Sequence, residues 1–152
     1  MDTRADRLAR AVRDHPLVVE ERAGHRCVAG AHSYLADGRV VCWVLPPWSG
    51  SGAPAEPEVG HAVDAELALQ RVPPSLGERW GGGVAQTPED FWDRWCATEV
   101  LAKLADVPMV LLARQGPVTR TPVRLSGVEV HWLVRRIDDV VVAHGMSWAT
   151  TT

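Results

Sequence analysis

The stretch WCATEVLAK (residues 95–103) contains a carboxylate and an ammonium group, spaced so that together they could transfer a proton or bind phosphate. Glu99 comes four residues before Lys103, the only lysine in the chain. Residues four apart lie on the same face of a helix. Two interpretations stay open. One is an exposed ion pair worth about 0.3–0.5 kcal/mol. The other is a site in which Glu99 is a base or metal ligand and Lys103 a phosphate-binding cation or proton donor.

A second pair of acids lies in the segment AVDAE (residues 62–66). Asp64 and Glu66 are two residues apart, so on a strand both side chains point to the same face. Adjacent carboxylates repel unless positive charge lies between them, and Mg²⁺ binds carboxylates together with waters and substrate phosphates. With Glu99 they would make three carboxylate ligands. Alternatively, Asp64 caps a following helix and Glu66 lies in its first turn.

The other reactive side chains give weaker signals. His32 and Ser33 precede a predicted turn, where polar residues are common. The cysteines form neither a CxxC pair nor an even set, so we expect reduced thiols in the core: Cys27, Cys42 and Cys96.

The element that carries Glu99 and Lys103 is predicted to be the principal helix. Thr87 suits the N-cap, Pro88 the first helical position, and the acids that follow complement the helix dipole. Because Pro108 disfavours helix just before it, the helix should end near Ala105.

The remaining pattern predicts an α+β chain, an antiparallel β-sheet packed on one long helix. We expect one domain over residues 1–152, which is long enough for one core. The predicted elements are a helix over 3–14, two strands around a turn within 25–45, a strand continuing as a short helix over 59–72, a closing β-hairpin over 127–146, and flexible loops at 46–58 and 77–86.

Composition narrows the function classes. A formal net charge of -3 argues against a general nucleic-acid binder, which would carry a basic excess. No apolar run reaches the length of a membrane span, and the first residues are charged, without the apolar region of a secretory signal. We therefore expect a cytoplasmic protein that binds neither nucleic acid nor membrane.

Three segments in order resemble the 4′-phosphopantetheinyl transferases. AHS (31–33), AVDAE (62–66) and WCATEVLAK (95–103) are similar to the family's S-H-S, G-I/V-D-I/V/L-E and W-S/T-x-K-E-A/S-x-x-K segments. The similarity covers roughly residues 25–147 and resembles the C-terminal half of the surfactin-synthetase-activating type, closing β-hairpin included.

The resemblance implies a phosphopantetheinyl transferase fold and a Mg²⁺-dependent reaction. These enzymes move 4′-phosphopantetheine from coenzyme A to a serine of an apo acyl or peptidyl carrier protein of fatty-acid, polyketide or peptide synthesis. By analogy, the metal ligands would be Asp64, Glu66 and Glu99. Glu99, or a metal-bound water beside it, would take the serine proton, and Lys103 would neutralise or protonate the leaving phosphate. His32 and Ser33 would contact coenzyme A.

The chain departs from the family pattern at three positions. Ala31 replaces the first serine, Ala62 the glycine, and Thr98 a lysine expected to contact coenzyme A phosphate. The larger type also has two similar halves with coenzyme A between them, whereas this chain matches one. We therefore expect a homo-oligomer, dimer or trimer, that completes the cleft. The alternative is a divergent homologue that binds coenzyme A or a carrier protein without transfer.

Overall fold

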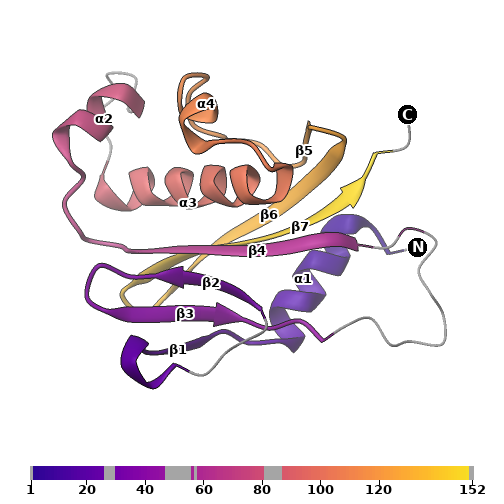
Figure 1. Ribbon diagram of the computed structural model, residues 1–152, viewed down its shortest axis with the longest axis horizontal. Helices are drawn as coiled ribbons and strands as arrows, with labels where there is room; N and C mark the ends of the chain where they lie inside the picture. Colours follow the sequence, from indigo (N-terminus) through magenta and orange to yellow (C-terminus); the bar gives the residue numbers. More distant parts are fainter. Residues whose placement is uncertain (1, 26–29, 47–55, 57, 81–86, 151–152) are drawn as a thin grey trace.

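The computed structural model describes residues 2–25, 30–46, 56, 58–80 and 87–150. Within them the chain is α+β, with antiparallel strands and several helices (Figure 1). In chain order the elements are α1 (Arg4–Asp14), β1 (Val18–Glu21), the 3₁₀ turn η1 (Arg22–Gly24), β2 (Ala31–Tyr34), β3 (Arg39–Trp43), β4 (Glu58–Leu67), α2 (Pro74–Trp80), α3 (Pro88–Ala105), α4 (Met109–Ala113), β5 (Val123–Leu125), β6 (Val128–Ile137) and β7 (Val140–Ala149).

The strands form two antiparallel sheets, ordered β1-β3-β2 and β4-β7-β6-β5. The edge strand β4 lies beside β2, so the two sheets adjoin there (Figure 1). β4 pairs with β7 along almost its whole length, with Asp64 opposite Ala143. This pairing fixes which β4 side chains face which layer, because strand side chains alternate.

Helices cover opposite faces of the four-stranded sheet. α3 lies along one face, and α1 packs with β3 on the other (Figure 1). The α1 side is filled by large apolar residues that include Leu8, Val41, Trp43, Val142 and Trp148. The α3 side includes Phe91, Trp92, Cys96, Val100 and Val141. Ala62 belongs to the α3 side and Val63 to the α1 side, so Asp64 and Glu66, in phase with Ala62, project toward α3.

α3 lies close against β7 at Gly145. A Cβ built on Gly145 would lie 2.2 Å from Val100 Cγ1 and 2.9 Å from Leu104 Cδ1, closer than atoms pack in proteins. The missing side chain therefore lets the helix lie against the sheet.

Several predicted elements are confirmed. α1 occupies the helix expected over 3–14, β2 and β3 form the expected pair around a turn, and β6 and β7 form the closing hairpin. α3 begins as expected, because the Thr87 hydroxyl accepts a hydrogen bond from the Asp90 N–H at 3.1 Å and Pro88 follows it.

The strand-then-helix prediction over 59–72 is wrong in its second part. β4 continues to Leu67 and ends in a turn, and the next helix, α2, begins at Pro74. The two prolines start this helix, since proline fits the first turn, where the lost N–H has no helical partner anyway. The alternative in which Asp64 caps a helix is therefore wrong, and the loop expected over 77–86 is helical up to Trp80. Its remaining part, and most of the loop expected over 46–58, lie outside the described residues.

Among the described residues, no helix is both long and apolar enough to cross a membrane.

Candidate functional site

Asp64 and Lys103 form an ion pair between β4 and α3. The Lys103 ammonium donates to Asp64 Oδ1 at 2.7 Å and to the Val63 carbonyl at 3.1 Å. Asp64 is 3% exposed, whereas the Lys103 side chain is 36% exposed. The Lys103 side chain thus extends from α3 to β4, and the ion pair lies at the border between the buried core and solvent.

Ser33 joins β2 to the same part of β4. Its hydroxyl accepts a hydrogen bond from the Ala65 N–H at 2.9 Å and lies 3.3 Å from both Asp64 Oδ1 and the Ala65 carbonyl. It therefore bonds the backbone of β4 along the edge that does not pair with β7, where the backbone groups of Ala65 would otherwise lack partners. Asp64 Oδ1 consequently has two neighbours that can donate, Ser33 and Lys103.

The electrostatics of this cluster are dominated by burial and excess negative charge. Burial raises the pKa of Asp64 to about 7; Lys103 opposes the rise, and the charges of Glu99 and Glu66 add to it. Burial also raises the pKa of Glu66, although Gln70 Nε2 donates to Glu66 Oε2 at 2.6 Å and opposes the change. Three carboxyl groups thus share one ammonium, and the cluster would be stabilised by further positive charge.

Cys96 lies in the core behind this cluster. It is a buried free thiol, and burial together with the nearby negative charges raises its pKa well above the usual value. A thiolate is the reactive form of cysteine, so this environment makes Cys96 an inert core residue, as predicted.

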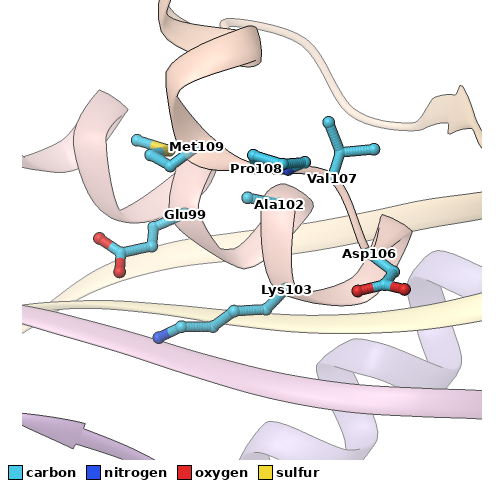
Figure 2. Close-up of a pocket in the computed structure, with 7 residues that line it drawn as sticks. All are labelled: Glu99, Ala102, Lys103, Asp106, Val107, Pro108 and Met109. Atoms are coloured by element: carbon cyan, nitrogen blue, oxygen red, sulfur yellow. The ribbon is translucent and has the colours of Figure 1, made fainter.

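An open pocket lies at the C-terminal end of α3, where the chain turns into α4. Its volume is about 400 Å³, and Glu99 and Lys103 line it together with Ala102, Asp106, Val107, Pro108 and Met109. Figure 2 shows the side chains of Glu99 and Lys103 leaving α3 toward the same side, with Met109 beside Glu99. The pocket could receive a polar group that contacts the acid and the base together.

The donor set suits a hard divalent cation. Asp64 Oδ2 is buried and has no hydrogen-bond partner among the described residues, and carboxylates are the ligands that Mg²⁺ prefers. However, the three carboxylates do not each place an oxygen within 4.8 Å of the others; among the described residues, only His25, His32 and Cys42 meet that spacing. Because Mg²⁺ keeps several waters and needs only one or two carboxylates, the arrangement fits a partly hydrated ion better than a closed cage of three acids.

Thr98, which precedes Glu99, faces the interior. It is fully buried; its hydroxyl donates to the Arg94 carbonyl at 2.8 Å and accepts from the Val118 N–H at 3.1 Å. Thr98 therefore ties α3 to the segment that follows α4. A long cationic side chain would not fit at this position without rearrangement of the packing.

The structure brings Ser33, Asp64, Glu66, Glu99 and Lys103 to one region, but it leaves His32 elsewhere. Side chains alternate along β2, so His32 projects from the face opposite Ser33 and lies near His25 and Cys42.

Two residues that lie beside the predicted ones were not identified from the sequence: Gln70, which contacts Glu66, and His25, which contacts His32. Gln70 lies just past the end of β4, and no motif marks it. His25 is seven residues before His32, a separation that reveals no proximity until the strands pair.

The expectation of three reduced thiols is wrong for Cys42, which is disulfide-bonded; Cys27 lies outside the described residues. An odd number of cysteines does not prevent one pair from forming, and the sequence gives no measure of spatial distance.

Comparison of the chain with protein-family models, curated proteins and solved structures found no match.

Proposed function

We propose that the protein is a Mg²⁺-dependent phosphopantetheinyl transferase with a phosphopantetheinyl transferase-like fold. The observation that carries the proposal is the cluster of three acids around the single lysine, beside an open pocket. The segments that resemble the transferase motifs supply Ser33, Asp64, Glu66, Glu99 and Lys103, and these residues lie together although they are distant in the sequence.

In the proposed reaction, the serine oxygen of the carrier forms a bond to the phosphorus that carries pantetheine. The bond between the two phosphates of coenzyme A breaks, and 3′,5′-ADP leaves. Glu99 is partly exposed in the pocket, so its carboxylate is placed to accept the serine proton.

Lys103 has the donors to meet the leaving phosphate. An ammonium group has three N–H donors, and two of them are used by Asp64 and the Val63 carbonyl. The third is left for a phosphate oxygen, so Lys103 can stabilise the charge that develops there. Asp64 and Val63 would thus position Lys103 for the reaction.

Asp64, with Glu66 or Glu99, would hold Mg²⁺. The ion would supply charge stabilisation at the diphosphate when bound. The unpartnered Asp64 Oδ2 and the shortage of positive charge around it support a cation here. Ser33 would keep β2 against β4 and hold Asp64 in place. A contact between His32 and coenzyme A gains no support from its position on the other face of β2.

We further propose that a second copy of the chain completes the cleft for coenzyme A. The pocket at the end of α3 is open, and the chain resembles only one half of the larger transferases. Light scattering after size-exclusion chromatography should therefore give the mass of a dimer or trimer. A monomer at all concentrations that support transfer would contradict this part of the proposal.

The reaction is tested by incubating the protein with coenzyme A, Mg²⁺ and several apo carrier proteins and following carrier mass. We expect the mass of one phosphopantetheine group to be added to at least one carrier, and Lys103→Met and Glu99→Gln to abolish the addition. The control is Glu89→Gln. Glu89 lies at the surface of the same helix and pairs with Arg136, away from the proposed site. Absence of transfer to every carrier would contradict the proposal. Calorimetric binding of coenzyme A without transfer would favour a binding module instead.

A further inference from the structure

A second cluster of potential ligands lies on the three-stranded sheet, on the face of β2 opposite Ser33. Cys42 on β3 is paired directly with His32 on β2, so the two side chains lie side by side on one face. His25, just after η1, packs its ring edge-on against that of His32, with centroids 4.9 Å apart. One ligand atom from each of the three residues lies within 4.8 Å of the others.

His25 is held in the orientation that metal-binding histidines commonly have. Its Nδ1 lies 2.6 Å from Glu20 Oε1, and its side chain is only 9% exposed. Its Nε2 is buried without a hydrogen-bond partner among the described residues. A carboxylate on one ring nitrogen fixes the tautomer and leaves the other nitrogen for a metal. A buried nitrogen without a partner lowers the stability of the folded protein, and a bound metal ion would remove this penalty.

We propose that His25, His32 and Cys42 form a zinc site that is available when the Cys42 disulfide is reduced. Two imidazoles and a thiolate are ligands that Zn²⁺ binds well and Mg²⁺ does not. Tetrahedral Zn²⁺, with bonds of about 2.0–2.3 Å, places its ligand atoms roughly 3.3–3.6 Å apart. The three groups therefore need to close by only a small distance. Bound zinc would fasten the turn after β1 to β2 and β3.

The disulfide and the zinc site are alternative states of the same sulfur. Cys42 is disulfide-bonded in the structure. A dithiol reductant would transfer two electrons and two protons to the disulfide, giving two thiols while the dithiol becomes a disulfide. The Cys42 thiol then loses its proton as the thiolate binds Zn²⁺. Oxidation would reverse these steps and release the metal, so zinc content would follow the redox state of the protein.

The test compares zinc binding by the oxidised and the reduced protein. Each form is incubated with Zn²⁺, freed of excess metal and analysed for zinc per chain, while near-ultraviolet circular dichroism monitors the fold. We expect about one zinc per reduced chain and none per oxidised chain. Co²⁺ in place of Zn²⁺ should give the intense visible bands of a tetrahedral site and a sulfur-to-metal charge-transfer band.

Variants assign the ligands. His25→Ala should abolish binding while leaving Cys42 in place, Cys42→Ser should remove the charge-transfer band, and Glu20→Gln should weaken zinc binding by about 10- to 100-fold. The control, His15→Ala, removes an imidazole outside the cluster and should bind zinc normally. The proposal is overturned if the reduced, folded wild-type protein takes up no zinc, if both redox forms take up the same amount, or if His25→Ala binds as wild type does.

Discussion

Replacing Asp64 with asparagine should remove a specific pH dependence of stability. The pKa of Asp64 is about 7 in the folded protein against an ordinary value of 3.8. Between these pH values the folded protein keeps a proton that the unfolded chain has released. The folded state is therefore favoured fully below pH 3.8, and this contribution is lost as the pH rises toward 7.

The size of this change in unfolding free energy follows from the rise in the Asp64 pKa. About three pKa units at 1.36 kcal/mol each give a loss of roughly 4 kcal/mol between pH 4 and pH 8. The titratable groups that face Asp64 are Lys103, Glu99, Glu66 and the Cys96 thiol. Asparagine has nearly the same shape and does not titrate. Lys103 is exposed enough to stay hydrated in the variant.

The assay is urea unfolding of wild type and Asp64→Asn at pH 4, 6 and 8 with a chelator present. The unfolding free energy of the variant relative to that of wild type should rise by up to about 4 kcal/mol from pH 4 to pH 8. Adding Mg²⁺ at pH 8 should stabilise wild type but not the variant, because binding to the folded state adds to its stability. A difference between the two proteins that stays constant with pH would refute the reasoning.

Three other substitutions test the packing around the site. Gly145→Ala should lower the unfolding free energy by about 1–3 kcal/mol, since its Cβ would overlap Val100; unchanged urea midpoints would show that α3 is not held so closely. Thr98→Val should cost about 0.5–1.5 kcal/mol in the same assay, because the partly buried Val118 N–H loses its acceptor, and a neutral effect would argue against that hydrogen bond. Glu129→Gln should reduce the loss of unfolding free energy between pH 4.5 and pH 2. Hydrogen bonds from His131 and arginines lower the Glu129 pKa from 4.5 to about 2, so the stability that Glu129 contributes is present above pH 4.5 and is lost toward pH 2. If the unfolding free energy of this variant falls with acid pH as that of wild type does, Glu129 does not make this contribution.

Local signals in the sequence predicted the elements that form from neighbouring residues. Thr87 and Pro88 mark the start of α3 through their own backbone preferences, and alternation identified the closing hairpin. The same logic placed Asp64 and Glu66 on one face of a strand. It failed at Pro73-Pro74, because a proline pair can end one element and begin another.

Contacts between distant segments could not be predicted from spacing. Lys103 was expected beside Glu99 on its helix, yet its ammonium binds Asp64, 39 residues away. The interior position of Thr98 and the meeting of His25 with His32 and Cys42 depend in the same way on tertiary packing. The resemblance to the transferases singled out five residues that lie together in the candidate site, but it also placed His32 with Ser33, although the two project from opposite faces of β2.

The most direct test of the proposed function is a crystal structure of the assembled protein with coenzyme A and Mg²⁺. It should place the coenzyme A diphosphate against Lys103, with the ion bound by Asp64 and by Glu66 or Glu99. Coenzyme A bound away from this cluster, or a diphosphate that Lys103 does not contact, would contradict the account.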